Sequence, residues 1–175
     1  MSRTQLVIDD KDRKDDGGNT QLMRAALDGH TEAVKDLLRK GANVNAQNHE
    51  GRTALMFAVI NLRTDSVKAL LKFGADVNVQ AVCGCTPLML AACSGDTGIT
   101  QTLLNSGAEA NRICRPGKTA LVVAVEHGYN AIVDLLKRAM GQSTRVKPER
   151  LPSNLSSREE SCVPSRQIEG GHRES

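Results

Sequence analysis

The 175-residue chain has almost no aromatic residues: it contains no tryptophan, one tyrosine and two phenylalanines. Any core that it forms must therefore be aliphatic and rich in alanine. The same shortage argues against a nucleic-acid partner, because nucleic-acid-binding surfaces stack bases on exposed rings. A net charge of +3 is also too small for the basic face that such binding requires. We therefore expect no nucleic-acid partner.

Long apolar runs are missing as well. No stretch approaches the roughly 20 apolar residues that cross a bilayer. The first residues, MSRTQLVIDDKDRKDD, contain no apolar signal core, and Ser2 excludes the glycine that N-myristoylation needs. We expect no membrane partner and a cytoplasmic location, with the nucleus as the alternative.

Motifs for catalysis and phosphate binding do not occur either. No serine or cysteine lies in a G-x-S-x-G context, and no glycine-rich loop precedes a phosphate-binding lysine. The four histidines are scattered, which is typical of structural or solvated side chains: His30, His49, His127 and His172. The sequence therefore predicts a protein that is not an enzyme and that holds no cofactor.

Five cysteines raise the question of a metal site. Four of them follow the spacing C-x-C-x7-C-x20-C, which differs from the patterns of zinc fingers and zinc ribbons. An intracellular location keeps such thiols reduced. We expect no metal, with zinc as the alternative, and a partly exposed patch of oxidisable thiols: Cys83, Cys85, Cys93 and Cys114.

The dominant feature that is present is a period of 33 residues. A glycine opens each period, a threonine follows two residues later, and a leucine and an alanine follow at fixed distances. A period of this length indicates a stacked repeat architecture. Such arrays bury one continuous core and expose a long surface, which suits binding better than catalysis. The opening glycines are Gly18, Gly51, Gly84 and Gly117.

Each period reads as two short helices. The phrases TQLMRAA, TALMFAV, TPLMLAA and TALVVAV begin with a threonine whose hydroxyl can cap a helix. Pro87 suits the first helical position of the third phrase. The second helix, for example DSVKALL, carries an apolar stripe through Leu37, Leu70, Leu103 and Leu136. Glycines 41, 74 and 107 then end it.

This wording resembles the ankyrin repeat family, from Gly17 to about Gly141. The resemblance implies a β-turn and two antiparallel helices per repeat, stacked into a curved all-α solenoid with projecting finger-like turns. We expect repeats at about 16–48, 49–81, 82–114 and 115–141. Residues 1–15 are expected to form a charged disordered arm, and residues 142–175 a disordered tail rich in Ser, Pro and Arg. Ser157 and Ser165, each beside an arginine, suggest regulatory phosphorylation as an alternative to a merely flexible tail.

Several residues depart from the family pattern. Methionines 23, 56 and 89 and Val122 stand where the family usually has histidine, so we expect that histidine's hydrogen bond to be lost and a thioether to fill the space. Leu62 stands where the other repeats have glycine between the two helices. If this turn needs a positive φ, leucine costs about 1 kcal/mol there and makes repeat two a soft spot. Thr100 replaces a stripe valine.

The two ends of the array differ. Repeat one is polar on its outer face, with Gln21 and Arg24 at positions that are apolar elsewhere. Repeat four ends in Lys137 and Arg138 but keeps the apolar segment Leu121–Val125. Either the last helix shields this segment or something else packs on it, and the chain beyond Gly141 is the local candidate. We expect a monomer, with association through this segment as the alternative.

The family resemblance places the partner-binding surface on the fingers and on the exposed ends of the first helices. The finger residues are His49, Glu50, Arg52, Val82, Cys83, Cys85, Arg115 and Lys118. The helix-end residues are Leu27, Asp28, Ile60, Asn61, Cys93, Glu126 and His127. Within this set four residues suggest an apolar strip, although scattered apolar residues are common on protein surfaces: Leu27, Ile60, Val82 and Cys93.

The sequence therefore predicts a non-enzymatic protein–protein interaction module, an adaptor or a scaffold. The alternative is a regulator that inhibits a partner enzyme or transcription factor by occlusion. Intrinsic catalysis has no constellation of residues behind it.

Overall fold

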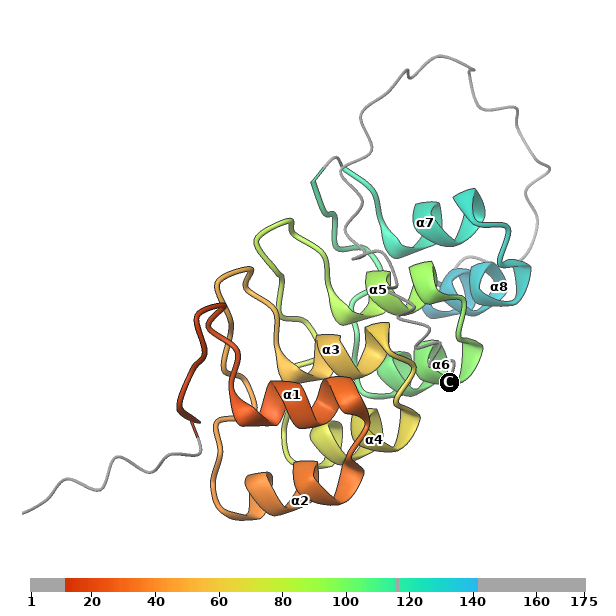
Figure 1. Ribbon diagram of the computed structural model, residues 1–175. Coiled ribbons are helices and arrows are strands. Elements are labelled where there is room, and N and C mark those ends of the chain that lie inside the picture. Colours follow the sequence, from red (N-terminus) through yellow and green to blue (C-terminus); the bar gives the residue numbers. More distant parts are fainter. Residues whose placement is uncertain (1–11, 116, 142–175) are drawn as a thin grey trace, which may run out of the picture.

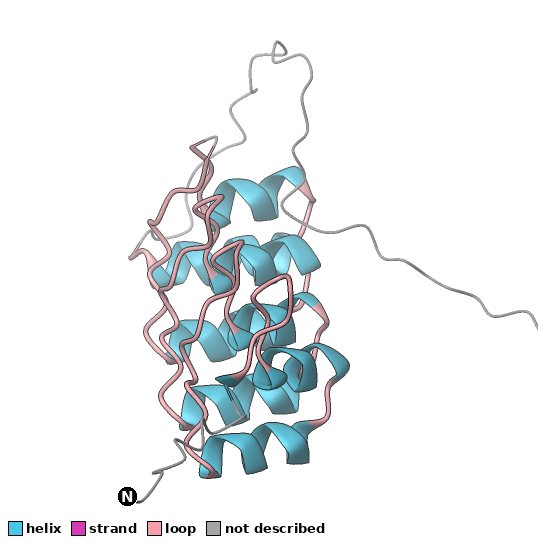
Figure 2. Cartoon of the chain, turned by 60° about the vertical axis from the view of Figure 1, so that its left-hand side comes forward, coloured by secondary structure: helices cyan, strands magenta, loops and turns pink. Residues whose placement is uncertain are grey.

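The computed structural model describes residues 12–115 and 117–141, and eight helices form two parallel rows within these residues (Figure 1). One row holds the inner helices α1 (Gln21–Asp28), α3 (Ala54–Ile60), α5 (Pro87–Ser94) and α7 (Ala120–Glu126). The other holds the outer helices α2 (Thr31–Arg39), α4 (Thr64–Lys72), α6 (Thr97–Asn105) and α8 (Asn130–Ala139). Loops connect each outer helix to the next inner helix along one side, and the described residues contain no strand (Figure 2). The all-α repeat stack expected from the sequence is confirmed.

A threonine caps every inner helix, and it is buried in the first three repeats and half-buried in the fourth. The hydroxyl oxygen of Thr53 accepts a hydrogen bond from the backbone N–H of Met56 at 3.4 Å, and the equivalent bonds in the other three repeats measure 3.3 Å. These bonds satisfy one of the amides that a helix N-terminus leaves unpaired. In repeat one the side-chain hydrogen bond that was expected to be lost with the histidine has a substitute. The Met23 sulfur accepts a hydrogen bond from the Thr20 N–H at 3.4 Å.

The core is aliphatic and runs through the stack without interruption. Ala58, Ala91 and Ala124 are fully buried where one inner helix meets its neighbours, so their small side chains allow close helix packing. Leucines 70, 103 and 136 are fully buried between the inner and outer rows. Thr100 is also buried, and its hydroxyl donates to the Asp96 carbonyl oxygen at 2.7 Å. The substitution of valine by threonine therefore leaves no unsatisfied polar group.

The turn inside repeat two is strained. Gly29, Gly95 and Gly128 have φ angles of 72–78°, and Leu62 adopts φ 56° at the same position. Leu62 is the one described non-glycine residue with positive φ, which confirms the predicted conflict. Left-handed backbone costs a residue with a side chain on the order of 1 kcal/mol.

Residues 12–15 differ from the prediction that residues 1–15 form a disordered arm, because three of them contact the first repeat. The Asp12 carboxylate accepts from the Asn43 N–H at 3.0 Å, and Lys14 Nζ donates to the Gln47 carbonyl oxygen at 2.9 Å. Asp15 pairs with Arg24 at 2.8 Å. Residues 12–15 therefore belong to the first repeat. Residues 1–11 and 142–175 lie outside the described residues, and with them the predictions for the outer arm, the tail, its serines, Cys162 and His172.

The strain at Leu62 gives a first test. Leu62→Ala and Leu62→Gly remove nearly the same packing, but only glycine relieves the positive φ. We expect the glycine variant to be more stable than the alanine variant by about 1 kcal/mol, measured by chemical unfolding. Glycine is ordinarily the less stable of the two, so the ordinary order would contradict the strain.

The Asp15–Arg24 pair gives a second test, by pH. The Arg24 guanidinium, and next the Asn19 backbone N–H, hold the pKa of Asp15 well below its usual range. A carboxylate with a lowered pKa in the folded state stabilises the fold above its unfolded pKa and loses this effect as pH falls through the folded value. We expect Arg24→Gln to raise the Asp15 pKa in NMR titration. An unchanged pKa would show that Arg24 is not the main cause.

Candidate functional site

The loops between repeats form tight hairpin turns at their tips, which we call the fingers: residues 49–52, residues 82–85, and Arg115, Gly117 and Lys118. In each finger a backbone N–H at the base bonds across to the other arm, as Asn48 does to the Arg52 carbonyl oxygen at 3.0 Å. Gly51, Gly84 and Gly117 have φ angles of 71–89° in these turns. Backbone hydrogen bonds and left-handed glycines therefore set the shape of the fingers.

Neighbouring fingers are joined in series by backbone hydrogen bonds. The Val82 N–H donates to the Glu50 carbonyl oxygen at 2.8 Å, and the Arg115 N–H donates to the Cys83 carbonyl oxygen at 3.0 Å. A Cβ on Gly51 would lie 2.9 Å from the Val82 backbone nitrogen, so only glycine allows this approach. The finger tips thus form one continuous edge.

A ladder of glutamines supports the fingers from below. Gln47 Nε2 donates to the carbonyl oxygens of Gly51, at 2.9 Å, and Gln80, at 3.5 Å. Gln80 Nε2 repeats the pattern one step later, to Gly84 at 2.9 Å and Ile113 at 3.2 Å. Each amide fixes its own finger and touches the next repeat. The finger backbone that carries the exposed side chains is consequently held in place by these hydrogen bonds.

The proposed apolar strip is uneven in exposure. Val82, on its finger, is 61% exposed, and Leu27, at the end of α1, is 39% exposed. Ile60 and Cys93, at the ends of α3 and α5, are half-buried, and Ile60 packs against the core. Of the four residues in the strip, Leu27 and Val82 are therefore the exposed ones.

The prediction of a partly exposed patch of thiols is wrong for two of its members. Cys85 is only 5% exposed and Cys114 is buried, because both lie at the bases of fingers and face the core. Cys83 and Cys93 are half-buried. Cys85 is therefore not part of the exposed candidate surface. Within the described residues no three His, Cys, Asp or Glu side chains are grouped so that they could hold a metal ion.

At the fourth repeat the candidate residues contact one another. Lys118 Nζ on the finger pairs with the Glu126 carboxylate at the end of α7, at 2.8 Å. Cys93 Sγ lies 3.8 Å from His127 Nε2, and His127 Nδ1 donates to the Val123 carbonyl oxygen at 2.9 Å. Burial raises the pKa of the Cys93 thiol, so the thiol stays protonated at neutral pH and is a poor nucleophile. These pairs fix the positions of the side chains at this end of the surface.

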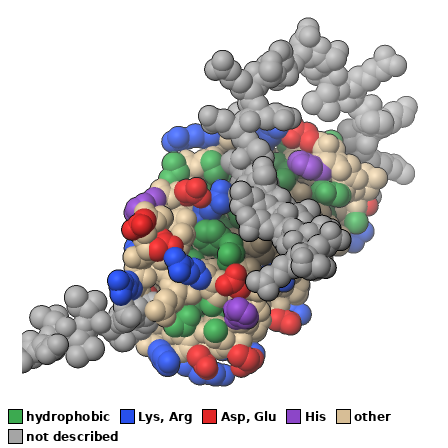
Figure 3. All heavy atoms as spheres, in the orientation of Figure 1, with side chains coloured by type: hydrophobic (Ala, Val, Ile, Leu, Met, Phe, Trp, Pro, Cys, Tyr) green, Lys and Arg blue, Asp and Glu red, His purple; other side chains and the backbone are tan. Residues whose placement is uncertain are grey.

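The remaining candidate residues are polar and include charges of both signs. Glu50 pairs with Arg52 at 3.0 Å within one finger, and His49 and Arg115 are exposed on the first and third fingers. Asp28 is exposed and Asn61 is half-buried, with the Asn61 amide donating to the Phe57 carbonyl oxygen at 3.0 Å. Figure 3 shows hydrophobic side chains on this face with acidic and basic side chains around them.

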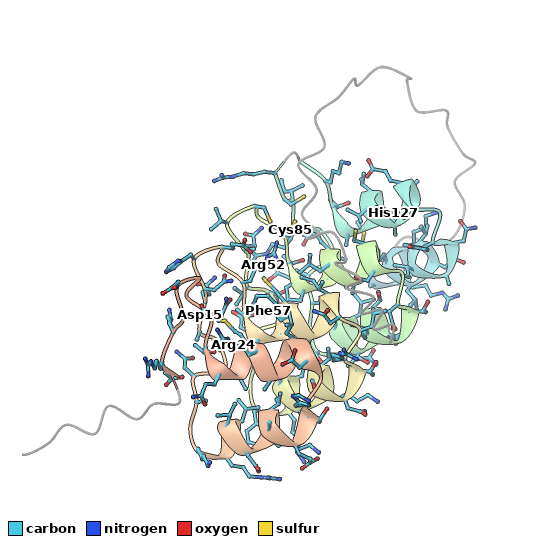
Figure 4. The ribbon with its side chains drawn as sticks, viewed as in Figure 1. Asp15, Arg24, Arg52, Phe57, Cys85 and His127 are labelled. Carbon is cyan, nitrogen blue, oxygen red and sulfur yellow. The ribbon has the colours of Figure 1, made fainter. Side chains whose placement is uncertain are left out.

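Sequence reasoning missed Phe57, which is half-buried on the exposed side of α3 (Figure 4). It stands three residues before Ile60, and residues at this spacing share a helix face. Arg24 occupies the same position one repeat earlier, and was interpreted only as an end-cap residue. The i,i+3 spacing was the available signal for both.

Comparison with known families decides the class. A family described as "Ankyrin repeats (3 copies)" matches residues 4–81 and again residues 64–147. The chain belongs to the ankyrin repeat family. Ankyrin repeats generally mediate protein–protein interaction. No significant match to this chain is found among curated proteins. Over the part of the chain that the structure describes, the helices fall short of the length and apolar character needed to cross a bilayer.

The close approach of the fingers gives a third test. Gly51→Ala and Gly117→Ala place a Cβ on equally left-handed backbone, but the Gly117 Cβ has nothing within 4 Å whereas that of Gly51 meets the next finger. We expect Gly51→Ala to lose at least about 1 kcal/mol more of unfolding free energy than Gly117→Ala. Equal losses in chemical unfolding would mean that the fingers are not held in contact.

Proposed function

We propose that this ankyrin repeat protein is a non-enzymatic adaptor or scaffold that binds a protein partner along its fingers and inner-helix ends. The observation that carries the proposal is the placement of exposed apolar side chains on a rigid frame. Val82 projects from a finger that is hydrogen-bonded to the fingers on either side of it. A side chain held in this way loses little freedom when a partner covers it, which lowers the entropic cost of binding.

Val82 and Leu27 are proposed as apolar anchors, with Phe57 and Ile60 as the half-buried surface between them. Burying the exposed parts of these side chains against a partner supplies the favourable free energy. The anchors come from different repeats, so a partner must span several repeats to contact both. This requirement favours an extended or large partner surface over a small ligand.

Charged residues of both signs surround the anchors and are proposed to select the partner. Glu50 and Arg52 come from one finger, and Arg115 and Lys118 from another. Because mixed charge repels surfaces of the wrong pattern, it contributes specificity and association rate more than affinity. The partner is therefore expected to carry a mixed-charge surface with an apolar centre.

The test is capture of a partner from the native cell extract by the full chain and by matched variants. Leu27→Asp combined with Val82→Asp is expected to reduce capture of the stoichiometric partner at least tenfold, because a charge replaces each anchor. Phe73→Asp is the control, since Phe73 is as exposed as Leu27 but ends the outer helix α4. Ile60 is avoided because it packs against the core.

Circular dichroism and melting temperature should be the same for all three proteins. Undiminished capture by the double variant, or an equal loss in Phe73→Asp, would overturn the proposed surface. Assaying the captured partner with and without the chain separates a scaffold, which leaves partner activity unchanged, from a regulator that acts by occlusion.

A further inference from the structure

The last inner helix has an uncovered apolar face. Val122 and Val125 of α7 are 40% and 47% exposed. The equivalent positions in the first three repeats are essentially buried, because the next inner helix covers them: Met23, Met56 and Met89, and Ala26, Val59 and Ala92. Within the described residues no further inner helix packs on the far side of α7. This face of α7 therefore matches the faces that pack against the next inner helix in the earlier repeats, but no described helix covers it.

A second feature at this end has no counterpart within the described residues. The Asn78 amide reaches the chain that follows the next outer helix, donating to the Gly107 carbonyl oxygen at 3.1 Å and accepting from the Glu109 N–H at 2.9 Å. Asn45 makes the matching pair of bonds one repeat earlier. Asn111 stands at the same position in the next step, and its side chain makes no such bond to any described residue. The equivalent backbone for Asn111 lies 29 and 31 residues ahead, at Met140 and residue 142, directly after α8.

The chain ends α8 with the same kind of turn that ends α6. Gly141 has φ 70° and its N–H bonds to the Arg138 carbonyl oxygen at 3.1 Å, as the Gly107 N–H bonds to Leu104 at 3.0 Å. Met140 occupies the register of the earlier glycines, so the turn comes one residue later. The described chain therefore ends where earlier repeats start the segment that Asn45 and Asn78 hold.

We propose that residues 142–151 of this chain dock on the open end, with Asn111 binding their backbone and Val146 and Leu151 covering Val122 and Val125. The reach is ample, because α7 is about 10 Å long and ten extended residues span about 33 Å. The match to the ankyrin family extends through residue 147, beyond the last described helix. This docking is independent of the proposed partner surface.

The size of the open face favours this segment over a second copy of the chain. The uncovered apolar strip is confined to α7, because Lys137 of α8 stands where the other repeats have leucine. A stable dimer buries on the order of 1,200 Å² or more, far beyond two valines on a seven-residue helix. A short segment with two apolar residues matches the strip in scale.

The direct test is photo-crosslinking in the full chain, with p-benzoylphenylalanine replacing Val125, or Phe73 as the control position. Crosslinks from position 125 to residues 142–151 of the same chain, absent from position 73, are expected by mass spectrometry. Crosslinks between two chains, accompanied by a dimer in sedimentation, would assign the face to a second copy and overturn the proposal. Absence of any crosslink from position 125 to residues 142–151 would also overturn it.

Hydrogen exchange measures the consequence. Val146→Asp combined with Leu151→Asp is expected to raise exchange of the α7 amides about tenfold, because the helix loses its cover. Val163→Asp combined with Ile168→Asp adds the same charge outside the docking segment and should leave α7 unchanged. Equal exchange in both double variants would contradict docking by residues 142–151.

Discussion

Each repeat depends on its neighbour to remove one side of its inner helix from water. The helices have only seven or eight residues in the inner row, too few to be stable alone. Alanines 58, 91 and 124 are fully buried because the adjacent helices approach closely, and leucines 70, 103 and 136 close the gap to the outer row. The stability of the array is therefore a sum of contacts between neighbours, and its shape follows from repeating one contact.

The helices position the repeats, and the fingers carry side chains that are available to a partner. Helix packing places the repeats, and backbone bonds between fingers then set the spacing of the tips. Since these bonds involve only backbone atoms and a glycine, the side chains at the tips are free to vary. Val82, His49 and Arg115 occupy equivalent positions with different chemistry. Such an arrangement separates the residues that specify the fold from those that specify a partner.

The fold was predictable because its determinants recur. The capping threonines, the alanines that allow close helix packing and the left-handed glycines each recur at a fixed interval, so each copy of the pattern supports the interpretation of the others. The strain at Leu62 was visible as an exception to that interval. The candidate site was less predictable because its residues do not recur. Cys85 shares a position with Arg52 and Lys118, yet Cys85 is buried in the core, whereas the two longer side chains pair with the carboxylates of Glu50 and Glu126. Depth at one position depends on side-chain length and neighbours, which a periodic pattern does not encode.

The hydrogen bonds of the glutamine ladder require a spacing of 33 residues between repeats. Gln47 reaches a carbonyl 33 residues ahead, and Gln80 does the same. Removing a complete unit would bring an equivalent carbonyl into the same place, whereas removing one residue from a loop would displace every later rung. Duplication or deletion of a whole 33-residue unit would therefore lengthen or shorten the array while keeping the partners of these amides in place.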